Sequence, residues 1–249
     1  MVLYIYMKDY RVSHMEERIV RQYEDVVYKP GSYDDYLWSH ERKILELEVI
    51  RLRTKCLSLS YLDFGCGTGR IISYMEQFAD LSLGVDISEP MIEVARSKVK
   101  KSGFIVADIT REDVLAGKTF DLITAFRIFL NAGPELRSSM LAALVPKLQN
   151  EDSLLIFNIH GNIMSHRIFT KLLFLLRGRN LNTMSVGEVK RFASEHGLEV
   201  VRWYGFGVIP KVFYRIFGGK LMFMLDSLLA RVPLMKFISY DLIFVCKKK

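Results

Sequence analysis

Short apolar runs separated by helical patterns recur between residues 57 and 160. The first run, residues 57–62, alternates apolar with polar positions, and helix-like spacing follows at Ile71, Ile72 and Met75. Further apolar runs stand at residues 81–88, 104–109, 120–126 and 154–159, with helical patterns after Ser88 and over residues 134–148. Five strands alternating with helices predict an α/β fold with a parallel, doubly wound sheet. Ligands of such sheets bind at the carboxyl ends of the strands.

The pattern continues on both sides of this region. Residues 39–53 have the spacing of a helix, and residues 187–196 predict another. The apolar runs at 198–204 and 240–246 predict two further strands. Between them, residues 205–239 carry large apolar side chains at helical spacing with Lys and Arg interspersed, which predicts a helical insertion before the last strand.

A glycine-rich turn follows the first predicted strand. Its sequence is Asp63-Phe64-Gly65-Cys66-Gly67-Thr68-Gly69. Glycine tolerates positive φ and lets a ligand approach the backbone closely, so the turn is typical of a nucleotide site. A dinucleotide fingerprint would place its last glycine at position 70, which is Arg70, and the P-loop pattern is absent. A tight turn without a ligand is the alternative for this turn taken alone.

Two acidic residues follow the next strands. Asp86 ends the second predicted strand, about 20 residues beyond the glycine-rich turn, where a carboxylate can accept hydrogen bonds from a cofactor ribose. Ser88 is the expected N-cap of the helix that follows, with Pro90 in its first turn. Asp108 ends the third predicted strand. A helix-capping role is the alternative for Asp108.

The D-x-G-x-G-x-G pattern resembles motif I of the class I S-adenosylmethionine (SAM)-dependent methyltransferases. The resemblance covers residues 57–160 and implies a Rossmann-like, mostly parallel sheet of seven strands with an antiparallel edge strand and an N-terminal helical cap. It also implies that Asp108 meets the adenine amino group, with Ile109 under the ring. The cofactor would be SAM, with S-adenosylhomocysteine as product. The expected SAM-binding residues are Tyr28, Tyr33, Asp63, Gly65, Cys66, Gly67, Gly69, Asp86, Ile87, Met91, Asp108, Ile109, Phe126 and Arg127.

These expectations describe a single domain over residues 1–249. Residues 8–55 would form the N-terminal cap, residues 56–160 the SAM-binding core, and residues 161–249 an acceptor-side region that contains the insertion at 205–239. In small-molecule members of the family such a cap shapes the acceptor pocket. Tyr28 and Tyr33 are therefore expected near SAM, with simple packing of the cap as the alternative.

His160 is the expected catalytic residue. It follows the fifth predicted strand directly, at the mouth of the expected cleft, and a histidine suits general-base work near neutral pH. His166 is the second choice, and a histidine without a catalytic role is the alternative. An acceptor that is already anionic needs no base. The three cysteines are scattered without metal-ligand spacing, so we expect no metal, no disulfide framework and a reducing compartment.

Positive charge is concentrated in the last third of the chain. From Ile163 to the end there are 15 Lys and Arg against 5 Asp and Glu. Because large apolar residues interrupt this charge, we expect no nucleic-acid partner. The insertion is expected to pack on the sheet and line the acceptor pocket, with contact to an anionic membrane surface as the alternative. No apolar stretch reaches the ~18–20 residues that span a bilayer, so we expect a cytoplasmic protein, or one peripheral to a membrane.

The resemblance therefore predicts an enzyme, a SAM-dependent methyltransferase. We expect a small-molecule acceptor that is methylated at oxygen, and a lipid- or sugar-linked acceptor is one form of this expectation. The chain is expected to be a monomer or a homodimer. One alternative is a quinone or isoprenoid-lipid C- or O-methyltransferase at the membrane surface. A non-catalytic SAM-binding protein is another.

Overall fold

A computed structural model describes residues 31–178 and 181–249 of the chain. Within this part, seven strands form one sheet. The strands are β1 (Ser60–Phe64), β2 (Leu81–Asp86), β3 (Gly103–Val106), β4 (Leu122–Ala125), β5 (Leu154–Ile159), β6 (Leu198–Phe206) and β7 (Asp241–Lys248). The helices are α3 (Tyr33–Arg53), α4 (Arg70–Met75), α5 (Glu89–Lys98), α6 (Pro134–Leu144), α7 (Arg167–Leu176), α8 (Val186–Glu195), α9 (Lys211–Phe217) and α10 (Gly219–Leu229), with short 3₁₀ turns η2 (Val145–Lys147) and η3 (Met235–Ile238).

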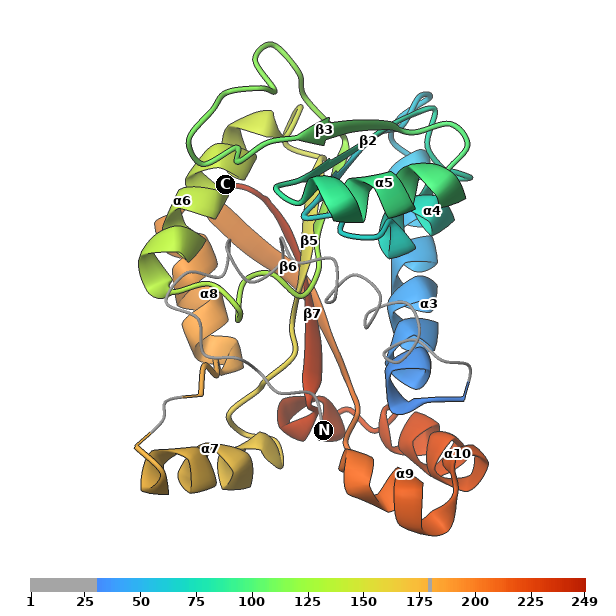
Figure 1. The fold of residues 1–249 in the computed structure, drawn as a ribbon, viewed down its shortest axis with the longest axis vertical. Coiled ribbons are helices and arrows are strands. Elements are labelled where there is room, and N and C mark those ends of the chain that lie inside the picture. The colour runs from blue at the N-terminus through green and yellow to red at the C-terminus, as the bar shows by residue number, and fades with distance from the viewer. Residues whose placement is uncertain (1–30, 179–180) are drawn as a thin grey trace.

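The sheet has the order β3-β2-β1-β4-β5-β7-β6 (Figure 1). The pairs from β3 to β5 are all parallel, whereas β7 runs antiparallel to both of its neighbours, β5 and β6. The predicted fold class is confirmed: a mostly parallel α/β sheet with an antiparallel pair at one edge. The carboxyl ends of β1 to β6 consequently share one edge of the sheet, which is also where β7 begins.

Helices cover both faces of the sheet, with α3, α4 and α5 on one side and α6 and α8 on the other (Figure 1). Successive strand residues point to opposite faces, so each strand feeds two cores. Ile156 packs in one apolar cluster with Leu45 of α3, while Phe157 packs in the other with Leu141 of α6. The central strands β4 and β5 are buried at every position, as expected for a parallel sheet that is covered on both faces.

Several predicted bounds differ from the structure. Leu57 is fully exposed, and the first strand begins only at Ser60, because the nitrogen of Leu59 donates to Asp80 instead of to a strand partner. The third strand ends at Val106, so Asp108 lies in the loop after it. The helix from Pro134 ends ten residues later and continues as the 3₁₀ turn η2.

One helix was missed altogether. Residues 172–176, a continuous apolar run, form the second half of α7, and over the whole helix the apolar positions recur at helical spacing opposite Arg167, Thr170 and Lys171. This helix leaves the carboxyl end of β5, and α9, α10 and η3 connect the carboxyl end of β6 to β7. All four lie at the same end of the molecule (Figure 1). In the described part of the chain, no helix is both long and apolar enough to cross a bilayer.

Candidate active site

The glycine-rich turn leaves the carboxyl end of β1 in a conformation that needs glycine. Gly65, Gly67 and Gly69 have φ of +66°, +52° and +81°, a region that side chains with a Cβ rarely adopt. A Cβ on Gly65 would lie 2.1 Å from Cδ1 of Ile128, and one on Gly69 would lie 2.8 Å from Cβ of Ala95. The turn is therefore pressed against the loop after β4 and against α5, and its backbone is exposed to whatever binds beside it.

Asp86 connects this turn to the second strand. Its Oδ2 accepts a hydrogen bond of 2.8 Å from the backbone nitrogen of Gly67, and its Oδ1 accepts one of 2.9 Å from the nitrogen of Ser88. Ser88 is the N-cap residue of α5, as predicted, but its side chain makes no capping hydrogen bond. The Asp86 carboxylate thus holds the turn and the start of α5 together while it faces the hollow described next.

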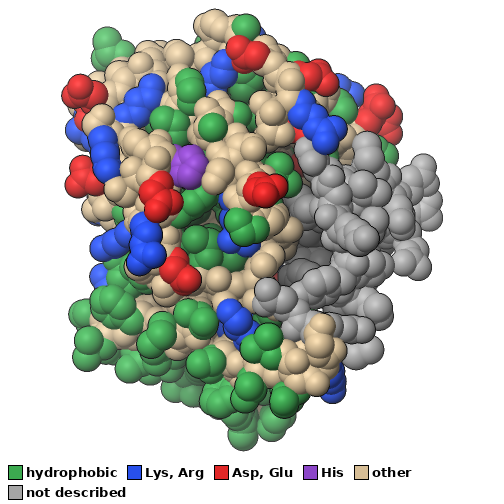
Figure 2. All heavy atoms as spheres, turned by 90° about the vertical axis from the view of Figure 1, so that its left-hand side faces the viewer, with side chains coloured by type: hydrophobic (Ala, Val, Ile, Leu, Met, Phe, Trp, Pro, Cys, Tyr) green, Lys and Arg blue, Asp and Glu red, His purple; other side chains and the backbone are tan. Residues whose placement is uncertain are grey.

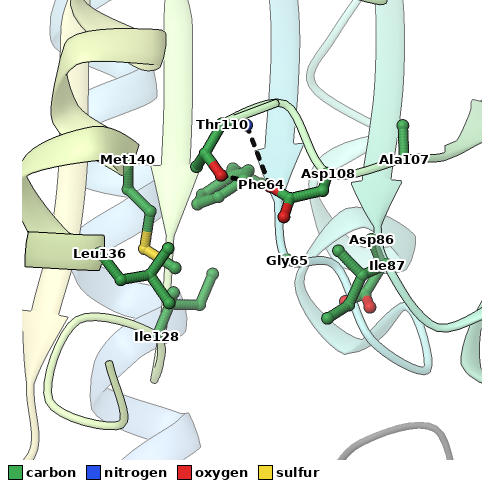
Figure 3. Close-up of a pocket in the computed structure, with 10 residues that line it drawn as sticks. All are labelled: Phe64, Gly65, Asp86, Ile87, Ala107, Asp108, Thr110, Ile128, Leu136 and Met140. Atoms are coloured by element: carbon green, nitrogen blue, oxygen red, sulfur yellow. Dashed lines mark hydrogen bonds between the residues drawn. The ribbon is translucent and has the colours of Figure 1, made fainter. Parts of the chain in front are cut away.

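A hollow of about 520 Å³, counted with the space open to solvent, lies at these strand ends (Figure 3). Asp86 and Asp108 border it, and Oδ1 of Asp108 accepts hydrogen bonds from the nitrogen and the hydroxyl of Thr110, 3.0 and 2.5 Å away. The lining residues are Phe64, Gly65, Asp86, Ile87, Ala107, Asp108, Thr110, Ile128, Leu136 and Met140. Two carboxylates beside an apolar wall suit a nucleoside, whose ribose and base amine are donors and whose ring is flat and apolar.

Other predicted cofactor residues lie beneath this surface. Ile109 and Phe126 are buried in the two cores and do not line the hollow. Met91 packs under the turn, where a Cβ on Gly67 would lie 3.7 Å from its Sδ. The thiol of Cys66 is buried and its pKa is raised by that burial, which fits a small filler better than a nucleophile. Tyr28 lies outside the described residues.

Six lining residues were not predicted: Phe64, Ala107, Thr110, Ile128, Leu136 and Met140. Ala107 and Thr110 lie within two residues of Asp108 in the loop after β3, so their nearness to a predicted site residue could have indicated them. Leu136 and Met140 come from α6 and lie four residues apart, on one face of the helix (Figure 3). The predicted helix showed that spacing, but nothing in the sequence indicated which face would turn toward the cofactor side.

Asp63, the first residue of the glycine-rich pattern, is completely enclosed. Its Oδ1 accepts a hydrogen bond of 2.7 Å from the hydroxyl of Thr124. Its Oδ2 is buried with no hydrogen-bond partner among the described residues. Burial raises the pKa of this carboxyl to about 7 although the hydrogen bond from Thr124 opposes the shift. This oxygen lies directly behind the turn and is closed off from solvent in the described structure.

Arg127 follows β4 and is held in a strained conformation. Among the described residues, Arg127 is the one non-glycine residue with a positive φ, which is 60°. Its backbone nitrogen donates to Oδ1 of Asn158 at 2.5 Å, and its guanidinium lies 3.3 Å from Asp34 and 3.5 Å from Glu41 of α3. Burial would raise the pKa of Asp34, but Arg127 and Lys211 outweigh it and hold that pKa below its usual range. The strand end is therefore bound to the N-terminal helix by charge.

His160 directly follows β5, one strand beyond β4, and is 5% exposed. Its Nδ1 has no hydrogen-bond partner in the described structure. Burial lowers its pKa to about 3, and the positive charges of Arg127 and Arg167 add to the effect. The imidazole is therefore neutral at physiological pH. Nearby, His166 and Arg167 pack on the ring of Tyr240, with the His166 ring 5.3 Å and the Arg167 guanidinium 5.6 Å from its centre.

Tyr33 lies in an aromatic cluster and does not line the hollow. Its ring centroid is 4.9 Å from that of Tyr214 and 6.3 Å from that of Tyr240. Its hydroxyl is buried without a hydrogen-bond partner in the described part of the chain, and a Cβ on Gly207 would lie 2.8 Å from it. The cap thus packs against the helical insertion through Tyr33, which is the alternative stated for this residue. Among the described residues, no group of three or more His, Cys, Asp or Glu could hold a metal ion.

Comparison with known proteins gives the same class as the fold. Solved structures with similar folds include the magnesium protoporphyrin IX methyltransferase of Synechocystis PCC 6803 with bound S-adenosylhomocysteine. It is 17% identical, has a TM-score of 0.60, and the match covers 94% of this chain and 99% of that one. The N-methyltransferase NodS of Bradyrhizobium japonicum, also with bound S-adenosylhomocysteine, is 12% identical with a TM-score of 0.62, over 96% and 98% of the two chains. At these identities the likeness is one of fold: the Rossmann-like fold of the SAM-dependent methyltransferases.

The sequence comparison narrows this to a family. Residues 62–145 match the model of a methyltransferase domain. A protein of Geobacillus sp. (strain WCH70), whose own assignment as a methyltransferase is provisional, is 29% identical over 118 residues. That match covers 45% of this chain and about half, 47%, of the relative. Residues 62–145 therefore carry a methyltransferase domain, and the glycine-rich turn and the sheet order agree with the fold of the SAM-dependent methyltransferases, which points to SAM as the cofactor.

Proposed function

We propose that the chain transfers the methyl group of SAM to an oxygen of a small-molecule acceptor, and that His160 receives or orients the acceptor's hydroxyl proton. The observation that carries this proposal is the place of His160: a buried, neutral imidazole with an unpartnered Nδ1, directly after the strand next to β4. Bound SAM supplies a methyl group on a positively charged sulfur, which an incoming nucleophile displaces in line.

The residues around the hollow fit the cofactor. Gly65 lines the hollow with its backbone, and Asp86 and Asp108 offer acceptors for hydroxyl and amine donors. Asp63 keeps a buried acceptor oxygen behind the turn. Under this proposal the chain's main contribution is to hold the two reactants in one orientation, which can supply about 7–11 kcal/mol of barrier reduction.

The low pKa of His160 restricts the acceptor. A base with a pKa of about 3 takes a proton efficiently only from a group that is itself acidic, since proton transfer follows the difference in pKa. The charges that lower this pKa, Arg127 and Arg167, also stabilise a negative charge on the acceptor oxygen. An acidic hydroxyl, phenolic or enolic, or a carboxylate therefore fits better than an aliphatic alcohol.

The test uses methyl-labelled SAM with a panel of phenols, enolic ketones, carboxylic acids and amines, and mass spectrometry to locate the added methyl group. Label on oxygen supports the proposal, and transfer only to amines or carbon contradicts it. His160→Gln should lower turnover about 100-fold with SAM affinity unchanged. The matched control is His196→Gln, whose Nδ1 lies 2.8 Å from the carbonyl oxygen of Phe192 at the end of α8, and it should retain full activity.

A lipid-linked acceptor, such as a quinone or isoprenoid, is the second candidate. One observation favours it: large apolar side chains are exposed on α7, α9 and α10, which extend from the same sheet edge as the hollow. The test is transfer of labelled methyl into an extract of the source cells, separated into organic and aqueous phases. Label in the organic phase supports a lipid-linked acceptor, and label confined to the aqueous phase rules it out in favour of a soluble one.

A further inference from the structure

Large apolar side chains are exposed along the whole of α7. The helix contains no buried residue, and Phe169 and Leu176 are 70% and 76% exposed. A helix of ten residues is marginal in water unless a partner covers its apolar side. The exposed apolar residues of this helix are Ile168, Phe169, Leu172, Leu173, Leu175 and Leu176. In the described structure, the burial that normally stabilises such a helix is missing.

The helical insertion continues this exposure. Phe217 and Leu234 are 57% and 73% exposed, the first at the end of α9 and the second just before η3. We call the exposed apolar side chains of α7, α9, α10 and η3, with those of the loop at 232–234, the apolar end. In the insertion its members are Val212, Phe213, Ile216, Phe217, Leu221, Met224, Leu225, Leu228, Val232, Leu234, Phe237 and Ile238. Patches of this extent mark interaction surfaces.

The members of the apolar end lie together in space. α7 and the pair α9 and α10 project from one end of the molecule (Figure 1), and in the space-filling view hydrophobic side chains dominate that end (Figure 2). In that view this end protrudes with a convex outline. A convex surface made of several helices suits a broad, deformable partner better than an extended peptide, which needs a groove or a free strand edge.

The charges around the apolar end are almost all positive. Residues 163–178 contain Arg167, Lys171 and Arg177 and no acidic residue. Residues 208–239 contain five cations, Lys211, Arg215, Lys220, Arg231 and Lys236, of which Lys211 pairs with Asp34 of α3 at 2.8 Å. Their single acid, Asp226, is buried, where it accepts hydrogen bonds from the nitrogen of Val208 and the hydroxyl of Tyr214. The outer surface of these segments therefore combines apolar side chains with cations.

We propose that the apolar end is a docking surface for a bilayer of anionic phospholipid. Apolar side chains of interfacial helices enter the boundary between headgroups and acyl chains, while Lys and Arg reach the anionic headgroups. A second copy of the chain fits less well, because a symmetric contact would bring the same cations of both copies together, and Asp34 beside Lys211 offsets only one of them. A buried core position for these helices is excluded by the exposure itself.

Docking in this way has a consequence for the site. α7 follows the carboxyl end of β5, and α9 follows that of β6, so the bilayer would face the same sheet edge as the cofactor hollow. A docked chain therefore presents its acceptor side to the lipid. The docking itself does not depend on which acceptor is methylated, and it is measured without any methyl transfer.

The experiment is sedimentation of the full chain with vesicles of phosphatidylcholine alone and with vesicles that contain one part phosphatidylglycerol to three parts phosphatidylcholine. We expect binding to the anionic vesicles, weakened by 0.5 M salt. The double variant Leu172→Glu, Leu176→Glu should lower the bound fraction at least tenfold. The charge variant Arg215→Gln, Lys220→Gln, Arg231→Gln should remove the preference for anionic lipid.

The matched control introduces the same charges elsewhere. Leu57 and Leu81 are 103% and 72% exposed, and they stand at the amino ends of β1 and β2, at the opposite edge of the sheet. Leu57→Glu, Leu81→Glu should bind vesicles like the parent chain. All these positions are exposed, so the thermal midpoint should stay unchanged and exclude misfolding. If the chain sedimented with neither vesicle type, the proposal would be overturned. It would also be overturned if Leu57→Glu, Leu81→Glu lost as much vesicle binding as Leu172→Glu, Leu176→Glu. Self-association would replace the proposal if the parent chain were a dimer that binds no vesicles and the double variant Leu172→Glu, Leu176→Glu were a monomer.

Discussion

The backbone nitrogen of Gly67 donates a hydrogen bond of 2.8 Å to Oδ2 of Asp86. The glycine-rich turn after β1 and the acid at the end of β2 are thus one unit, although 19 residues separate them in the chain. Because Asp86 also accepts from the nitrogen of Ser88, its carboxylate is fixed in place before any ligand arrives. A side chain that is already oriented loses little entropy on binding, so the arrangement favours tight cofactor binding.

Replacing Asp86 should therefore weaken cofactor binding through two effects. Asp86→Ala removes the acceptor for a ribose and releases the turn, and we expect SAM affinity to fall at least tenfold, about 1.4 kcal/mol or more. Asp86→Asn keeps one acceptor oxygen, so its affinity for SAM should lie between that of the parent chain and that of Asp86→Ala. Calorimetric titration with SAM measures both. Equal affinity for all three chains would remove Asp86 from the cofactor site.

A second prediction concerns the contact between Gly65 and Ile128. Gly65→Ala places a Cβ at φ +66° and against Cδ1 of Ile128, whereas Gly117→Ala has the same backbone strain at φ +69° with nothing within 4 Å. We expect a loss of about 1–2 kcal/mol in the free energy of unfolding for Gly117→Ala, and about 1–3 kcal/mol more for Gly65→Ala.

Urea unfolding of the two variants measures this difference. Adding Ile128→Val, which removes the clashing Cδ1, should recover most of the extra loss in Gly65→Ala and none of the loss in Gly117→Ala. If Gly65→Ala and Gly117→Ala cost the same, the close approach of the two loops is not what requires glycine at position 65.

Arg70 shows how far the sequence could be interpreted. Its position excluded a dinucleotide fingerprint, and that inference needed only the spacing of the glycines. Its partners could not be predicted, because they come from a distant helix: its guanidinium lies 2.5 Å from the buried Glu41 and 4.4 Å from the centre of the Trp38 ring. Strands, helices and the acids at strand ends follow from local patterns, whereas pairing between α3 and the turn depends on the tertiary fold.

Two other residues illustrate the same limit. The cluster around Tyr33 joins α3 to residues more than 170 positions away, so local spacing could not choose between the cofactor and the aromatic neighbours. No side-chain cap precedes α7, so the helical spacing of its apolar residues was the only local signal of a helix there. Local patterns therefore placed Gly65, Asp86 and Asp108 at neighbouring strand ends, whereas the contacts of α3 and of the helical insertion depend on the tertiary fold.

The buried carboxyl of Asp63 should make the protein less stable as pH rises. Its pKa is raised from 3.8 to about 7 by burial, so the folded state favours the neutral form. The cost of ionising it grows above pH 3.8 and is complete above about pH 7. Asp63→Asn keeps the acceptor for Thr124 and removes this cost.

We therefore expect Asp63→Asn to have a higher thermal midpoint than the parent at pH 8 without SAM, and a smaller advantage at pH 5. The increase in midpoint that SAM produces should be smaller in the variant, since the buried charge is lost. Thermal unfolding at pH 5 and 8, with and without SAM, gives both quantities. An advantage of equal size at both pH values would show that the ionisation of Asp63 does not limit stability.

The last prediction concerns Glu48, which ties α3 to β6. Its side chain is completely buried and accepts hydrogen bonds from Nη2 of Arg202 at 2.6 Å and from the hydroxyl of Tyr204 at 2.5 Å. Burial would raise its pKa, but these partners, with Arg51, hold the pKa below its usual value of 4.5. The stabilisation is present above pH 4.5 and is lost as pH falls through the lowered pKa.

Glu48→Gln removes the charge, but Arg202 and Arg51 are 35% and 44% exposed and can be solvated, so we expect a loss of about 1–3 kcal/mol in the free energy of unfolding at pH 7. Asp152→Asn is the control, because Asp152 pairs with Lys55 and Lys247 at the surface, where ion pairs contribute little. Urea unfolding at pH 7 and pH 4 should show a large difference between Glu48→Gln and the parent that narrows on acidification. If Glu48→Gln matched Asp152→Asn at pH 7, the attachment of α3 to the sheet would rest on apolar packing alone.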